Sequence, residues 1–139
     1  MRRGGSPAVP GPGPAARDTR QKRAIRRVLE HADRPLSPDE ILAAALPHSE
    51  GLGIATVYRS LRALVDERWL SAVEVPGRPV LYERSGKSHH HHFMCDVCAR
   101  VYEIEGCDVS ATLPRGFRAR DHDVTIYGTC RDCSANRRR

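Results

Sequence analysis

The chain has 139 residues, enough for one domain or two small ones, and 40% of them are apolar, so a folded core is possible. Its formal net charge of +6 and isoelectric point of about 9.4 favour an anionic partner such as nucleic acid. No apolar run approaches the ~20 residues that span a bilayer, and the N-terminus lacks the apolar core of a secretory signal. We therefore expect a cytoplasmic protein with no membrane partner and with reduced cysteines.

The first segments are a tail and a helix. Residues 1–16 are mainly Pro, Gly and Ala, a composition that cannot bury a core and predicts a disordered tail. Residues 18–32 predict a helix, because Ile25, Val28, Leu29 and Ala32 repeat at i, i+3, i+4 and i+7. The rest of its surface is basic, which is either an ordinary solvated face or a surface for phosphates; the residues are Arg20, Lys22, Arg23, Arg26 and Arg27.

Two further helices and a hairpin follow. The run Ser37-Pro38-Asp39-Glu40 is a capping box that opens a helix to about Leu46, burying Ile41, Leu42 and Ala45. Residues 55–68 predict a third helix, with Val57, Leu61, Leu64 and Val65 on its buried face and Tyr58, Arg59 and Arg62 on the other. Alternating residues predict strands at 70–75 and 80–83 around a Pro76-Gly77 turn. This order is typical of a winged helix-turn-helix, whose third helix enters the major groove.

The composition changes after the polar linker at residues 85–88. Helical periodicity ends, His and Cys residues concentrate, and short strands are expected at 92–94, 100–104 and 123–128. We therefore predict an α+β protein with an N-terminal winged helix-turn-helix domain at 17–84 and a small C-terminal α/β dimerisation and metal-binding domain at 89–134. Residues 85–88 are the expected hinge, and residues 135–139 the expected basic tail.

Two C-x-x-C pairs form the strongest local motif. Cys95, Cys98, Cys130 and Cys133 have the spacing that places four thiolates around one structural Zn²⁺. The alternatives are a redox pair or four unrelated thiols. Cys107 is left over: our preferred interpretation is a small, buried or half-buried thiol, and the alternative is an extra ligand or a redox-sensitive group.

The histidine run 89–92 precedes the first cysteine pair. On a strand, alternate residues face opposite sides, so His89 and His91 would face one way and His90 and His92 the other. One run would then serve two sites, with further candidate ligands at His122, Glu83 and Glu103. The alternative is a solvated His-rich loop.

Four motifs together resemble the ferric uptake regulator family of dimeric, metal-sensing transcription repressors. They are "GIATVYRSL", "LYER", "HHHHFMCDVC" and "HDVTIYGTCRDC", and the resemblance covers roughly residues 17–134. It implies a homodimer that binds double-stranded DNA, with Tyr58 and Arg59 on the recognition helix, Arg62 on the same face and Arg20 at a phosphate contact. It also implies three metal sites: structural zinc at Cys95, Cys98, Cys130 and Cys133; a regulatory site at Glu83, His90, His92 and Glu103; and a further site at His89, His91 and His122.

Two positions depart from the family pattern. Pro35 stands where many members have a histidine that joins the regulatory site, so either Glu83 alone links the site to the first domain or Asp33 or His31 substitutes. Ser110 stands where the further site usually has a glutamate, on a helix that Pro114-Arg115-Gly116 shortens. That site is then either degenerate or completed from the residues Glu105, Cys107 and Asp108.

The functional hypothesis is a metal-dependent repressor of metal-homeostasis genes. Metal that bridges Glu83 to His90, His92 and Glu103 would fix both recognition helices against a palindromic operator. Two carboxylates and two imidazoles suit Fe²⁺ or Mn²⁺, which we rank slightly above Zn²⁺. The alternatives are a peroxide-sensing member of the family and a zinc-stabilised interaction module without sensing. A small zinc enzyme would leave the winged helix unexplained, so we expect no enzymatic activity.

Overall fold

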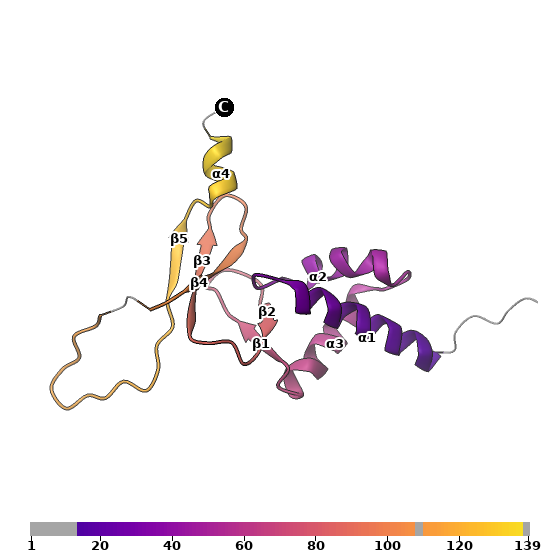
Figure 1. Cartoon of the computed structure of the whole chain (residues 1–139), viewed down its shortest axis with the longest axis horizontal. Helices are drawn as coiled ribbons and strands as arrows, with labels where there is room; N and C mark the ends of the chain where they lie inside the picture. The colour runs from indigo at the N-terminus through magenta and orange to yellow at the C-terminus, as the bar shows by residue number, and fades with distance from the viewer. Residues whose placement is uncertain (1–13, 108–109, 138–139) are drawn as a thin grey trace, which may run out of the picture.

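The computed structural model describes residues 14–107 and 110–137. The helices are α1 (Pro14–His31), α2 (Pro38–Ala45), the 3₁₀ turn η1 (Leu46–His48), α3 (Ile54–Asp66) and α4 (Arg131–Asn136). The strands are β1 (Leu70–Val73), β2 (Leu81–Arg84), β3 (His90–Cys95), β4 (Val101–Glu105) and β5 (Thr125–Gly128). Figure 1 shows the helices α1 to α3 beside the β1–β2 hairpin, and the second sheet standing upright next to them with α4 at its end.

Helix α1 begins earlier than the sequence pattern indicated. Residues 1–13 of the expected tail 1–16 lie outside the described part of the chain. The last three residues of that tail, Pro14, Ala15 and Ala16, are helical. The prediction that the helix starts at residue 18 was therefore wrong by one turn. Proline is favoured in the first turn of a helix and alanine has the highest helix propensity, so the Pro-Ala-Ala run extends the helix without any apolar periodicity.

Helices α1, α2 and α3 and strand β1 enclose the main core. In α2, the Ser37 side chain accepts a hydrogen bond from the Glu40 N–H while the Glu40 carboxylate accepts one from the Ser37 N–H, so the capping box is formed as predicted. Helix α3 ends in a left-handed residue, Arg68 (φ 59°), as in a Schellman cap. The buried core residues are Ala24, Ile25, Leu29, Leu36, Ile41, Ala45, Leu52, Val57, Leu61, Leu64 and Leu70.

The hairpin β1–β2 is the wing of the winged helix. Its strands pair antiparallel from Leu70↔Arg84 to Val73↔Leu81, and Leu36 adds a bridge on the other edge by exchanging backbone hydrogen bonds with Tyr82. That bridge brings the segment after α1 beside strand β2. Three helices followed by this hairpin and a second, smaller sheet agree with the predicted α+β winged-helix architecture.

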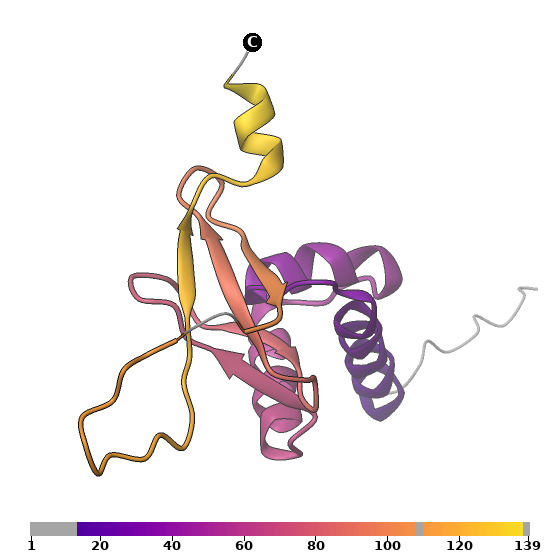
Figure 2. The same ribbon diagram turned by 60° about the vertical axis from the view of Figure 1, so that its left-hand side comes forward.

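The second sheet has the strand order β4-β3-β5. Strand β3 is antiparallel to β4 and parallel to β5, with His92 opposite both Glu103 and Thr125. The segment 106–124 lies between β4 and β5 and is here called the excursion. Its described residues project away from the body of the molecule (Figures 1 and 2). Its described residues contain no helix, so the expected short helix there was wrong: Pro114 and a left-handed Gly116 (φ 86°) interrupt it, and its described residues 110–123 are all exposed.

A small second core joins the wing to the second sheet. Val73, Val75 and Leu81 of the hairpin region pack against Met94 of β3 and Val101 of β4, all less than 9% exposed. Apolar burial thus crosses the expected hinge at 85–88, and the two parts are docked in this conformation. None of the helices in the described residues is long and apolar enough to cross a bilayer.

Candidate metal centres and nucleic-acid interface

The four paired cysteines converge at one end of the second sheet. Cys95 ends β3 and lies beside Gly128 in the parallel ladder with β5, so the start of α4 reaches the turn after β3. One sulfur atom from each of Cys95, Cys98, Cys130 and Cys133 lies within 4.8 Å of the others. The Cys98 and Cys130 sulfurs are 3.9 Å apart, which matches the roughly 3.8 Å between thiolates around a tetrahedral Zn²⁺.

The charges at this cysteine cluster call for a cation. Backbone N–H groups of Cys98, Cys130 and Val97 hydrogen-bond to the Cys95 sulfur and lower its pKa to about 6. The Cys133 backbone and the Tyr102 hydroxyl lower the pKa of Cys130. Hydrogen bonding to the Cys130 sulfur, with burial, raises the pKa of Cys133 to about 12. The pKa values of Cys95 and Cys130 are thus lowered beside a Cys133 whose pKa is raised, a conflict between neighbouring thiols that a divalent cation removes.

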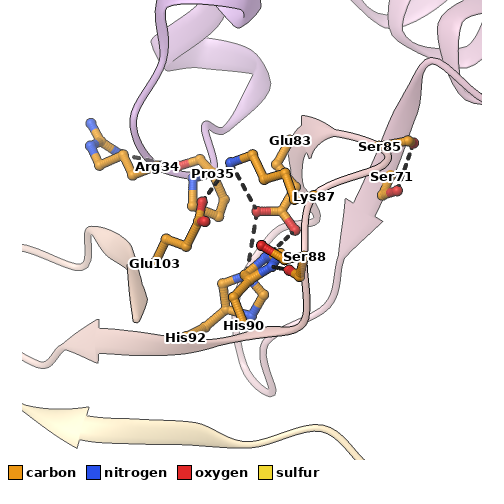
Figure 3. Close-up of polar contacts among 10 residues, drawn as sticks. All are labelled: Arg34, Pro35, Ser71, Glu83, Ser85, Lys87, Ser88, His90, His92 and Glu103. Carbon is orange, nitrogen blue, oxygen red and sulfur yellow. Dashed lines mark hydrogen bonds and ion pairs between the residues drawn. The ribbon is translucent and has the colours of Figure 1, made fainter. Parts of the chain in front are cut away.

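A second cluster lies where the wing meets the second sheet. Glu83 of β2 is 7% exposed and points at two imidazoles of β3 (Figure 3). Its Oε1 is 2.9 Å from His90 Nε2, and its Oε2 is 3.4 Å from His92 Nε2. We call Glu83, His90 and His92 the hinge cluster, because its carboxylate and its imidazoles come from opposite sides of the linker 85–88.

A backbone hydrogen bond orients the ring of His90 so that its Nε2 is the atom available to a metal. His90 Nδ1 donates to the Ser88 carbonyl oxygen at 2.8 Å, so its Nε2 faces Glu83. Burial alone would lower the pKa of His90, but the Ser88 and Glu83 hydrogen bonds raise it overall. Burial would likewise raise the pKa of Glu83, but hydrogen bonds from His92 and His90 lower it overall. An Nδ1–H held by a carbonyl is the usual support for a histidine that binds metal through Nε2.

Glu103 does not join the hinge cluster, although the register places it on the correct face. It lies directly opposite His92 on β4, and paired residues share a face of a sheet. Its carboxylate instead forms an ion pair with Lys87, whose ammonium is also 3.9 Å from Glu83 Oε2 (Figure 3). The sequence interpretation missed Lys87; the available signal was a lone cation four residues after Glu83.

The first domain supplies no replacement for the family histidine in this structure. Pro35 lies close to the hinge cluster (Figure 3), as the Leu36–Tyr82 bridge dictates, but its side chain carries no donor atom. Of the described residues, neither Asp33 nor His31 belongs to the group, and His31 Nδ1 bonds to the Arg27 carbonyl oxygen at 2.8 Å. Glu83 is thus the ligand candidate from the winged-helix side.

A third cluster lies on the opposite face of β3. One ligand atom from each of His89, His91, Cys107 and His122 lies within 4.8 Å of the others. Cys107 is exposed, so the preferred interpretation of a buried or half-buried thiol was wrong. Glu105 pairs with His90 and therefore lies on the face of the hinge cluster, which excludes it as a substitute ligand here. Asp108 lies outside the described residues.

The basic and aromatic residues expected at DNA are on the surface. Tyr58 of α3 is 53% exposed, and Arg59 and Arg62 are exposed beside it. The three side chains line one hollow with Ala72 and Tyr82 of the wing, so the helix and hairpin present a continuous surface. Arg20 is exposed on α1. This is the arrangement by which a winged helix presents its third helix to a groove.

Comparison with known proteins agrees with this geometry. A model of the ferric uptake regulator family matches residues 15–127. The chain belongs to the ferric uptake regulator family. The ferric uptake regulation protein of Campylobacter upsaliensis is 30% identical to it over 124 residues, covering 84% of this chain and 79% of that protein. The zinc uptake regulation protein of Mycobacterium tuberculosis (strain CDC 1551 / Oshkosh) is 31% identical over 122 residues, covering 84% and 94% respectively.

A solved structure supports the same assignment. The ferric uptake regulator of Helicobacter pylori, which has three functional metal binding sites, superposes with a TM-score of 0.63 at 26% identity. The match covers 82% of this chain and 79% of that one. Ferric uptake regulator family proteins are metal-dependent transcriptional regulators, not enzymes, which confirms the predicted class of function. Members of the family bind DNA and act as dimers.

Proposed function

We propose that this ferric uptake regulator family protein is a repressor that binds a palindromic operator as a homodimer when a divalent metal occupies the hinge. The observation that supports this most is the contact of Glu83, on the wing, with His90 and His92, on the second sheet. A ligand set drawn from both sides of a hinge makes metal binding depend on how the two parts are oriented.

The proposed mechanism is a two-state hinge. In the docked state, Glu83, His90 and His92 would hold the metal, and Glu103 would join them after leaving Lys87. In the open state, Glu83 moves away with the wing, and the histidines lose a charged ligand. The docked state then binds metal more tightly, and couplings of this kind typically change DNA affinity by roughly 5- to 150-fold. A metal with equal affinity for both states would change nothing.

The other predicted residues have distinct proposed roles. We assign the four paired cysteines to structural zinc, whose binding energy contributes to folding. Arg20 would contact phosphate and give salt-dependent affinity, while Tyr58, Arg59 and Arg62 would reach the major groove. His89, His91 and His122 belong to a further metal site on the other face of β3.

The ligand atoms at the hinge restrict the choice of regulatory metal. Two carboxylates and two imidazoles suit Fe²⁺ or Mn²⁺, and Zn²⁺ also accepts them. The similar proteins named above include an iron regulator and a zinc regulator, so they do not separate these metals. We rank iron or manganese slightly above zinc and propose that the protein acts in the cytoplasm on metal-homeostasis genes.

DNA binding with and without metal tests this proposal. An operator is first selected from a random-sequence duplex pool with the full chain and Mn²⁺, and its affinity is then measured at buffered free Mn²⁺. We expect Mn²⁺ to strengthen binding by roughly 5- to 150-fold, and Glu83→Ala to abolish this gain. Glu74→Ala, which removes an exposed carboxylate from the same hairpin, is the matched control and should behave like wild type.

The opposite result identifies the competing function. If the chain binds the selected duplex equally with and without metal, and Glu83→Ala changes nothing, the hinge is not a sensor. The protein would then be a zinc-stabilised binding module. Comparing Fe²⁺ and Zn²⁺ with Mn²⁺ in the same assay ranks the regulatory metals.

A further inference from the structure

The third cluster brings together four side chains from three separate segments. His89 and His91 lie at the start of β3, Cys107 follows β4 at the beginning of the excursion, and His122 lies near the excursion's end. The His89 and His91 Nε2 atoms are 3.3 Å apart, and the His89 and His122 Nε2 atoms 3.1 Å. The Cys107 sulfur is 3.0 Å from the same His122 nitrogen.

These contacts do not form a good hydrogen-bond network. A neutral Nε2 either donates or accepts, so either His89 shares one N–H between His91 and His122, or His122 shares one N–H between His89 and Cys107. His91 is only 4% exposed, and its buried Nδ1 has no hydrogen-bond partner among the described residues.

A cation at the centre resolves the conflict. Donors that surround Zn²⁺ as a tetrahedron lie roughly 3.3–3.8 Å from one another, given bond lengths of about 2.0–2.3 Å. The distances of 3.0–3.3 Å in this cluster are close to that range without any rearrangement of the backbone. Four ligands also fill the tetrahedron, so the site would be closed, as structural zinc sites are.

We propose that Cys107 is the fourth ligand of this site, which makes it a His₃Cys zinc centre. Ser110, where a carboxylate was expected from the family pattern, is therefore not needed, and the site is complete without it. The proposal goes beyond the regulatory function, because the hinge cluster lies on the other face of β3 and shares no ligand with this one.

The thiolate changes both the metal preference and the role of the site. A sulfur ligand favours Zn²⁺ over Mn²⁺ and Fe²⁺, whereas the hinge cluster contains only oxygen and nitrogen donors. Besides the paired cysteines, the chain thus carries two metal-ligating clusters of different selectivity. Cys107 and His122 are 15 residues apart and lie near the two ends of the excursion, so a shared metal fastens both ends to β3.

Cobalt spectroscopy on the full chain with its structural zinc retained tests the role of Cys107. Added Co²⁺ should produce a near-ultraviolet thiolate-to-cobalt charge-transfer band in the wild type and in Glu83→Ala. Cys107→Ser should lose that band and bind Zn²⁺ at this site at least tenfold more weakly. One zinc per chain, measured by elemental analysis, confirms that cobalt has not replaced zinc at the paired cysteines.

Alkylation of the wild type provides a second readout that needs no variant to fold. Iodoacetamide should modify Cys107 in the protein that holds only its structural zinc, and a further equivalent of Zn²⁺ should protect it, as mapped by mass spectrometry. Identical cobalt spectra for wild type and Cys107→Ser, or Cys107 alkylated equally at both zinc levels, would overturn the proposal. Either result leaves metal-dependent DNA binding through Glu83 unaffected, so the two hypotheses fail separately.

Discussion

Lys87 is the cation that the hinge carboxylates contact in this structure. Its ammonium lies between the carboxylates of Glu103 and Glu83, and its side chain is 27% exposed. Two carboxylates next to one another repel unless a cation separates them, and in this structure the cation is a side chain. If Glu103 joins a metal at the proposed site, as we propose above, the metal has to displace Lys87 from it, and the lysine would then raise the free metal concentration that is required.

Removing that charge should make the hinge a stronger metal site. We expect Lys87→Met to raise Mn²⁺ affinity roughly two- to fivefold, or about 0.5–1 kcal/mol, since a partly exposed ion pair is worth about that much. Arg78→Met, which removes an exposed cation from the hairpin turn, is the control and should leave affinity unchanged. A calorimetric titration with Mn²⁺ measures the affinity of each variant. Unchanged or weaker binding by Lys87→Met would show that Lys87 does not compete with the metal.

At the scale of single residues, the sequence predicted most members of each metal-ligating cluster but not all of them. The spacing of the cysteines and the alternation of histidines on β3 were sufficient to predict the groups that the structure brings together. The contacts of Glu103 and Cys107 were harder to predict. Those of Glu103 depend on the register of β4 against β3, and those of Cys107 on the path of the excursion. A one-residue shift in the β3–β4 register would have exchanged the faces on which Glu103 and Ile104 lie.

At the scale of elements, the capping box fixes where α2 begins and thereby how it packs against α3. The Glu40 carboxylate accepts hydrogen bonds from the Ser37 N–H and from Arg34. Burial alone would raise the pKa of Glu40, but these hydrogen bonds and the Arg34 charge lower it overall. A lowered carboxyl pKa stabilises the fold above the pKa of the unfolded chain, and this contribution is lost as pH falls through the native pKa.

Glu40→Gln should therefore lower the free energy of unfolding by about 0.5–1 kcal/mol at neutral pH, a value reduced because the side chain is 34% exposed. The difference from wild type should shrink below a pH of about 4.5 as Glu40 protonates. Denaturant unfolding from pH ~7 to pH ~3.5 measures it. Asp39→Asn, in the same first turn, is the control. A difference that does not vary with pH would show that the charge of Glu40 plays no part.

Elements with strong local signals were predicted well. The apolar stripe of α3 and its exposed Tyr58 agree with the structure, and α2 begins at its capping box. The differences lie where apolar periodicity is absent. The first turn of α1 is a Pro-Ala-Ala run, and α4, which was not predicted from the sequence, has no apolar stripe and forms where Cys130 and Cys133 converge. The helix that the family resemblance implied in the excursion is absent from its described residues, which have turn residues but no packing partner.

At the scale of the whole molecule, the winged-helix part and the second sheet lie side by side (Figures 1 and 2). They are docked through the core of Val73, Val75, Leu81, Met94 and Val101 and through the hinge cluster. The order of the parts was readable from the sequence, because each has its own pattern and the family motifs occur in order. Their docking was not, because residues from the hairpin and the second sheet meet through contacts that no local periodicity encodes.

The central claim is that docking and metal binding at Glu83 are coupled to DNA binding. Linkage requires the coupling to be reciprocal: if metal raises DNA affinity by a factor, DNA must raise metal affinity by the same factor.

The most direct test is to measure Mn²⁺ affinity of the zinc-containing chain with and without its selected operator, from free Mn²⁺ quantified by electron paramagnetic resonance. We predict tighter binding on the operator by the factor that Mn²⁺ confers on DNA affinity, within roughly 5- to 150-fold, and no change for Glu83→Ala. Equal Mn²⁺ affinity with and without the operator would contradict the account.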